Sequence, residues 1–284
     1  MQFQAALILE DGVNKGVFTA GILDFFQNHQ LYLPYVAAIS VGICNAMDYT
    51  SRQPGKTRSC MIPAERNVPP IHWCNLYRKG SVIDLDLVFG EYPNRLDPFD
   101  FAAFQNSETT CEFVVTNCRT GMAEYLSERK NKERMLAICR ARCSMPYILP
   151  MEPVGEESYL DGGISDPLPV DHARLRGYEK VIVILKQRKG FLPHGLCCEP
   201  YLIRSMYRKY PALSEALGSR IERYKSRLSY IERLEKAGAI YAIRPEKVEA
   251  KALCMDERKL KRFYMQGYET AETNFAAVMD YLRK

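Results

Sequence analysis

The sequence lacks any long hydrophobic run. None of its 284 residues belongs to an apolar stretch of about eighteen, the length that a membrane-spanning helix needs. The amino terminus also lacks a basic segment followed by a cleavage site, and a β-like segment begins there at once. We therefore expect neither a membrane span nor a secretory signal, and we expect a cytoplasmic protein.

Histidine is scarce, with four in the chain, and no two of the ten cysteines have the C-x-x-C spacing of a zinc site. Scattered cysteines favour reduced thiols over disulfides. The glycine-containing segment 12–16 lacks the Gly-Lys-Ser/Thr ending of a phosphate loop and the first two closely spaced glycines of a dinucleotide loop. We expect no metal and no cofactor.

Nucleic-acid binding is also disfavoured, because the chain has no zinc-finger spacing, RNA-binding signature or basic tail. The composition, 47% hydrophobic, is sufficient for a substantial core. We predict a single α/β domain over residues 1–284, with a helical carboxyl-terminal portion from about residue 200.

Apolar runs and turn residues predict an alternation of strands and helices. The predicted strands are 5–9, 35–39, 180–185 and 239–243, and a hairpin joins 111–116 to 122–126. The predicted helices are 17–27, 41–51, 131–142 and 211–236, followed by a helical region at the carboxyl end. The stretch 52–70 is interpreted as a loop, and the pattern over 71–110 favours neither structure.

Residues 36–43 form a short apolar run that breaks at Ser40, with Ala38 and Gly42 two positions to either side. The pattern A-x-S-x-G is typical of a nucleophile elbow, where a strand turns sharply into a helix and a strained serine needs small neighbours. Serine and glycine recur by chance, so the pattern alone favours a buried turn over a nucleophile. Ser40 is the candidate nucleophile, and the surrounding sequence decides between a nucleophile and a buried turn.

That context includes the turn at 10–16, which lies between the first predicted strand and the first predicted helix. Neighbouring parallel strands end at the same edge of a sheet, so this turn should lie beside Ser40. Amides at a helix amino terminus can hold the negative oxygen of a tetrahedral intermediate. We expect four residues to supply these amides: Gly12, Val13, Asn14 and Lys15.

A carboxylate followed by two glycines occurs at Asp161, Gly162 and Gly163. Glycines let the backbone approach another segment closely, as a general base beside a serine must do. Asp161 is therefore the candidate base.

With these three elements the chain resembles the patatin-like phospholipases, and in particular their bacterial cytosolic branch. That family combines a G-G-G-x-R/K-G oxyanion loop, a G-x-S-x-G elbow and a D-G-G/A motif with the aspartate of a Ser-Asp dyad. The resemblance implies that Ser40 is the nucleophile and Asp161 the base, with Gly16 ending the oxyanion loop. It also implies a three-layer α/β/α fold with a mostly parallel central sheet. Similar segments extend over most of the chain: 16–24, 44–46, 98–100, 115–118, 144–146 and 162–169.

Three residues depart from the family pattern: Asp11 and Val13 replace loop glycines, and Ala38 replaces the first glycine of the elbow. A β-branched residue forced to a positive φ is strained by roughly 1–3 kcal/mol. The Asp11 carboxylate could itself accept hydrogen bonds from the amides meant for the oxyanion. We therefore expect a slow or gated hydrolase.

The expected reaction is the hydrolysis of fatty acyl esters or phospholipids through an acyl-serine. A Ser-His-Asp triad would have to use Ser40, Asp161 and His194, but the early position of the elbow argues against an α/β-hydrolase. The alternative from another class is a non-catalytic lipid-binding or regulatory protein. The sequence gives no indication of the oligomeric state.

Basic residues concentrate in the segment 201–236, which contains nine Lys and Arg but only four Glu. The apolar stripe of this segment favours a helix with one face on the core and a solvated charged face. The alternative is a surface that makes peripheral contact with an anionic membrane.

Overall fold

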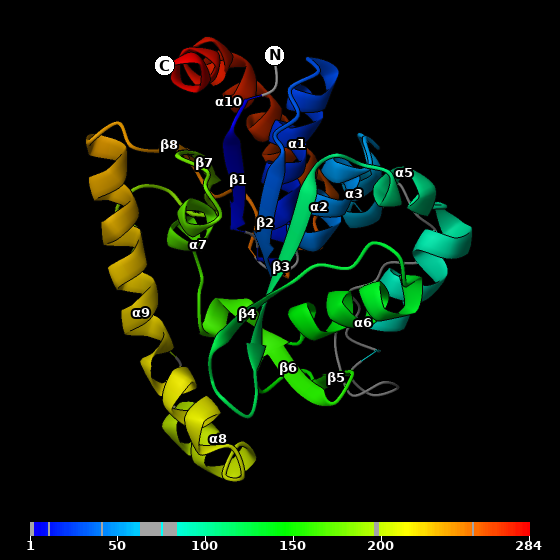
Figure 1. The fold of residues 1–284 in the computed structure, drawn as a ribbon, viewed down its shortest axis with the longest axis vertical. Coiled ribbons are helices and arrows are strands. Elements are labelled where there is room, and N and C mark those ends of the chain that lie inside the picture. Colours follow the sequence, from blue (N-terminus) through cyan, green and yellow to red (C-terminus); the bar gives the residue numbers. More distant parts are fainter. Residues whose placement is uncertain are drawn as a thin grey trace.

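The computed structural model describes residues 3–10, 12–40, 42–62, 75, 84–195, 199–251 and 253–284 (Figure 1). Its strands in this part of the chain form one sheet. They are β1 (Ala5–Glu10), β2 (Tyr35–Ile39), β3 (Thr110–Asn117), β4 (Ala123–Leu126), β5 (Glu152–Val154), β6 (Glu157–Asp161), β7 (Lys180–Ile184) and β8 (Tyr241–Ile243).

The sheet is mixed and mostly parallel, as the sequence predicts. Its order is β5-β6-β3-β2-β1-β7-β8, with β4 also paired to β3. The neighbours from β3 to β8 run parallel, whereas β4 and β6 are antiparallel to β3. The predicted hairpin is thus confirmed as the β3–β4 pair.

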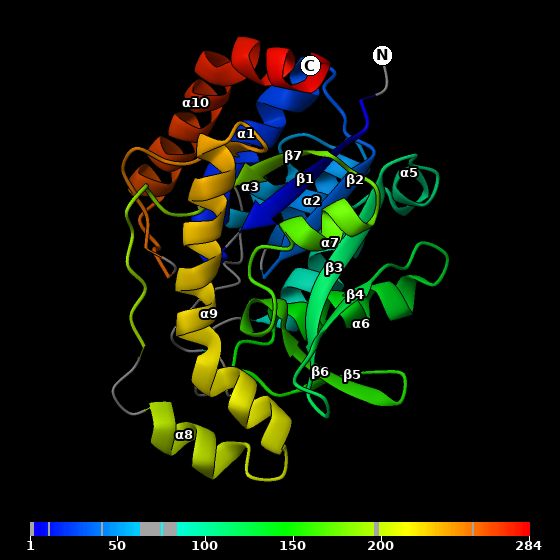
Figure 2. The ribbon, with the colours of Figure 1, turned by 60° about the vertical axis from the view of Figure 1, so that its left-hand side comes forward.

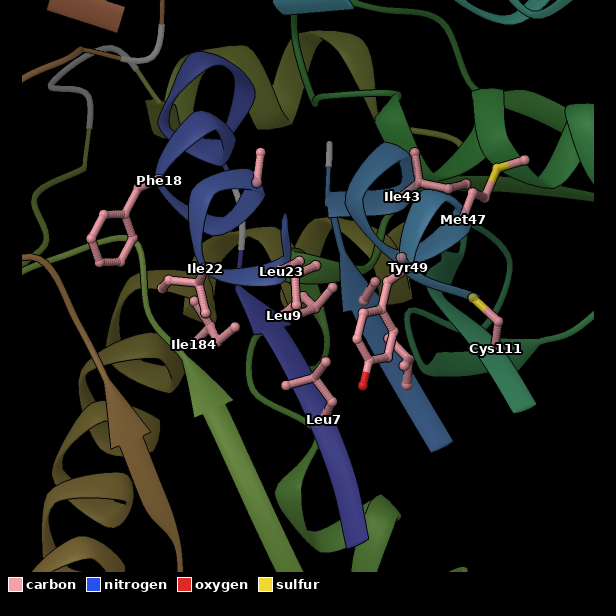
Figure 3. Packing of buried hydrophobic residues seen from close by; sticks show 14 of the residues in the cluster. Leu7, Leu9, Phe18, Ile22, Leu23, Ile43, Met47, Tyr49, Cys111 and Ile184 are labelled. Carbon is pink, nitrogen blue, oxygen red and sulfur yellow. The ribbon is translucent and has the colours of Figure 1, made fainter. Parts of the chain in front are cut away.

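Alternate residues of the parallel strands pack on opposite faces of the sheet, which explains their continuous apolar runs. In β1, Leu7 and Leu9 pack into one core and Ala6 and Ile8 into the other. Figure 3 shows Leu7 and Leu9 of the first core close to the helix that carries Leu23. The result is a three-layer α/β/α arrangement.

Helices cover both faces of the sheet (Figures 1 and 2). The core on one face includes residues of α1 (Gly16–Asn28), α2 (Gly42–Thr50), α6 (Lys132–Cys143) and α10 (Glu257–Arg283). The core on the other face includes residues of α7 (Val170–Leu175) and α9 (Pro211–Lys236). Shorter elements are η1 (Val13–Lys15), α3 (Lys56–Met61), η3 (Leu87–Leu96), α5 (Phe101–Gln105), η4 (Gly162–Ile164) and α8 (Glu199–Met206).

The prediction of a loop over 52–70 is wrong for its first part, because α3 occupies Lys56–Met61. This helix has six residues, too few for an apolar period to show. Residues 63–70 lie outside the described part of the chain. In the stretch that the sequence left unassigned, the π-helix η3 and the short α5 are present.

No helix in the described ranges combines the length and apolarity that crossing a bilayer requires. All seven cysteines within those ranges are free thiols, which agrees with the expectation of reduced cysteines. Their positions are 44, 60, 111, 118, 139, 143 and 254.

Candidate active site

Ser40 stands at the point where β2 ends and the chain turns into α2. Its φ is 53°, in the left-handed region that a serine rarely adopts, and its side chain is 8% exposed. Strain of this kind marks a nucleophile elbow, because the turn presents the hydroxyl above the strand end. Ala38 is fully buried in β2, where its methyl group packs in the core.

Asp161 is the last residue of β6, which pairs with β3, the strand that also pairs with β2. Ala38 pairs with Phe113, and Asp161 pairs with Val115 two residues further along β3. Because β4 occupies the other side of both β3 residues, β2 and β6 lie on one side of β3 and meet end to end. Ser40, two residues beyond Ala38, therefore comes level with Asp161.

Both residues that follow Asp161 have a structural role. A Cβ on Gly162 would lie 2.3 Å from the carbonyl oxygen of Val114, which leaves no room for any side chain. The amide of Gly163 donates to Asp161 Oδ1 at 2.7 Å and so fixes the carboxylate.

The predicted oxyanion loop is the short 3₁₀ turn η1 that leads into α1. Val13 has a φ of 47°, so this β-branched residue sits in the left-handed region that favours glycine. The Lys15 amide donates to the Gly12 carbonyl at 3.0 Å, so it is not free to hold an oxyanion. Of the four amides predicted to hold the oxyanion, those of Gly12, Val13 and Asn14 remain as candidates. Asp11 lies outside the described residues.

Two side chains tie this turn to its surroundings. The amide group of Asn14 donates to the carbonyl of Cys254, and that of Asn45 in α2 donates to the carbonyl of Gly16 at 2.9 Å. The first contact joins the turn to the segment before α10, and the second joins it to the helix of the elbow. The geometry of the turn relative to Ser40 is therefore fixed from two directions.

Ser40 and Asp161 line one cavity of about 460 Å³. Gly12, Val13 and Lys15 of the turn line it as well, so the three predicted elements converge. Much of the remaining wall is apolar, with Ile39, Met145, Pro146, Ile148, Ile164, Pro167, Phe191, Pro193 and Ile221. This combination suits an acyl chain beside a reactive serine.

The sequence analysis missed a polar cluster at the edge of this cavity. Lys186 follows β7, and its ammonium lies 3.2 Å from the buried carboxylate of Glu10 at the end of β1. Tyr224 of α9 also donates to Glu10. Burial lowers the pKa of Lys15, and the neighbouring charge of Lys186 adds to this effect. The rule that parallel strands end at one edge could have found Lys186, because it follows a predicted strand.

His194 also lines the cavity, which brings the three residues of the alternative triad to one place. Its side chain is exposed, and in the described part of the chain no hydrogen bond joins it to Ser40 or Asp161. We expect His194→Ala to change kcat/KM for a p-nitrophenyl ester by less than about threefold, whereas loss of a general base costs about 10²–10⁴-fold. A loss of a hundredfold, measured at pH 7 on folded protein, would instead establish a triad.

The described residues contain no group of three or more His, Cys, Asp or Glu side chains arranged to hold a metal ion.

Some of the basic residues of 201–236 form ion pairs with acidic residues of the protein itself. Arg220 pairs with Glu199, and Arg227 pairs with Asp171. These contacts account for part of the positive charge of α9 without a membrane.

Residues 7–174, more than half of the chain, match the patatin-like phospholipase family. The chain belongs to this family. The matched segment contains Ser40, Asp161 and the turn at 12–16. Residues 210–283 match a second family, described as a domain of unknown function, DUF6363.

Among curated proteins, the chain is 28% identical over 188 residues to the uncharacterized protein YjjU of Escherichia coli K12. The match covers 63% of this chain and 51% of that protein, so the chain spans about half the length of this relative. Among solved structures, VipD from Legionella pneumophila matches with a TM-score of 0.45 and 13% identity, over 98% of this chain and 66% of that one.

Proposed function

We propose that this patatin-like protein is a serine hydrolase of fatty acyl esters or phospholipids that works through a Ser40–Asp161 dyad. Asp161 accepts the proton of the Ser40 hydroxyl as its oxygen attacks the ester carbonyl. The amides of Gly12, Val13 and Asn14 stabilise the oxyanion, and the leaving alcohol takes the proton. Water then attacks the acyl-serine, with Asp161 again as the base.

The observation that carries this proposal is the convergence of Ser40, Asp161 and the turn on one largely apolar cavity. Both residues are buried, at 8% and 7% exposure, so the reacting hydroxyl and carboxylate are largely shielded from bulk water. The reduced thiols agree with a cytoplasmic location, which belongs to the same proposal.

We propose further that turnover is slow. Val13 holds a strained positive φ, and the Lys15 amide is already bonded to the Gly12 carbonyl. The loss of one oxyanion donor typically raises the barrier by about 2.7–4 kcal/mol. If turnover is lost completely, the protein would be the non-catalytic lipid-binding or regulatory protein that is the alternative to an enzyme. Peripheral contact of the basic 201–236 segment with an anionic membrane would serve either function.

A fluorophosphonate probe tests the nucleophile directly, because it reacts covalently with an activated serine. We expect labelling of the wild-type protein and none of Ser40→Ala, with p-nitrophenyl esters turned over slowly by the wild type alone. Absence of labelling on folded wild-type protein would contradict the enzyme proposal. Labelling without turnover would favour the binding protein.

A further inference from the structure

The segment that matches a domain of unknown function forms a wall of the catalytic cavity. Three residues of α9 line the cavity that holds Ser40 and Asp161. They are Arg220, Ile221 and, one turn later, Tyr224. Figure 2 shows α9 running along the sheet, and residues of α9 and α10 belong to the cores on opposite faces of the sheet. The cavity is therefore built by both family segments together.

Two contacts hold α9 in this position. Tyr224 donates to Glu10 at the end of β1, next to the oxyanion turn. Arg223 donates to the carbonyl of Ile164 in η4, directly after the Asp161 motif, at 2.5 Å. Each contact joins α9 to one catalytic element, so the position of the wall is coupled to the site.

The far end of the wall is fixed by a buried carboxylate. Glu199 of α8 accepts from Arg220 Nε at 2.6 Å and from the Tyr147 hydroxyl at 2.9 Å. Tyr147 also lines the cavity. A methyl group built on Gly195 would lie 3.6 Å from Cγ1 of Ile221, so Ile221 also faces the segment that carries His194.

We propose that α9 selects the substrate by the length of its acyl chain, with Ile221 as the residue that limits the space. This inference rests on the proposed hydrolase function and deepens it. Ile221 is the aliphatic side chain that α9 presents to the cavity, between charged or hydroxyl-bearing neighbours. An acyl chain bound at Ser40 and directed along the apolar wall would end against it.

The test is the profile of kcat/KM over p-nitrophenyl esters from acetate to dodecanoate. Ile221→Trp should lower the value for long chains by about tenfold or more relative to acetate, and Ile221→Ala should shift the preference to longer chains. Glu222→Trp is the matched control, because the neighbouring Glu222 side chain is 76% exposed and lies outside the cavity.

An unchanged profile in both Ile221 variants would overturn the inference even though acetate hydrolysis continues. If the wild-type protein neither hydrolyses the acetate ester nor reacts with the fluorophosphonate probe, that result would instead contradict the proposed function. If Ile221→Trp does not fold, Ile221→Ala alone decides, because a smaller side chain places no new atoms in the cavity.

Discussion

Replacing Asp161 with asparagine is expected to lower kcat/KM for a p-nitrophenyl ester by about 10²–10⁴-fold. The amide cannot accept the Ser40 proton, yet it fits the space of the carboxylate, and its oxygen can still accept from the Gly163 amide. Binding of the ester should be little changed, so the loss should appear in kcat. Steady-state kinetics between pH 5 and pH 9 provide the measurement.

Asp171→Asn is the matched control for this experiment. Asp171 lies ten residues further along, pairs with Arg227 on α9 and does not line the cavity. It should retain wild-type activity to within about twofold, as expected for a partly exposed ion pair of small energetic weight. If Asp161→Asn and Asp171→Asn had equal activity, Asp161 would not be the base.

The dyad could be predicted from the sequence because each half is a local motif. The elbow at Ser40 needs small residues two positions away, and Asp161 needs two glycines directly after it. The structure explains the stricter of these demands, since the backbone of Val114 leaves no room for a side chain at Gly162. Local steric rules of this kind are visible in one sequence without knowledge of the fold.

The walls of the site could not be predicted in this way. The contact between Tyr224 and Glu10 joins residues 214 positions apart, and no short pattern encodes it. The periodicity of α9 correctly indicated one face on the core, but an apolar stripe does not show which part of that face borders a cavity.

The consequence is a division of labour between the two matched segments. The 7–174 segment supplies Ser40, Asp161 and the oxyanion turn, whereas 210–283 supplies one wall and the helix packed behind α1. Asn14 reinforces this coupling, because it donates to the carbonyl of Cys254, just ahead of α10. Changes in the carboxyl-terminal segment should therefore alter activity as well as stability.

Gly267→Ala is expected to destabilise the protein by about 3 kcal/mol. A Cβ at Gly267 of α10 would lie 2.1 Å from the carbonyl oxygen of Phe18, and one at Gly21 of α1 would lie 2.1 Å from that of Tyr264. Two helices that meet backbone to backbone cannot admit a methyl group unless one of them moves. Because α1 begins at Gly16, directly after the oxyanion turn, the same movement should reduce esterase activity.

Gly218→Ala in α9 is the control with the opposite expected sign. A Cβ there would meet no atom within 4 Å, so alanine should stabilise the helix by roughly 0.5–1 kcal/mol through its lower conformational entropy in the unfolded chain. Chemical denaturation of both variants, with m-values compared, measures the two effects. Equal midpoints for Gly267→Ala and the wild type would show that α1 and α10 do not meet at these glycines, and the coupling of α10 to the oxyanion turn would then lose its basis.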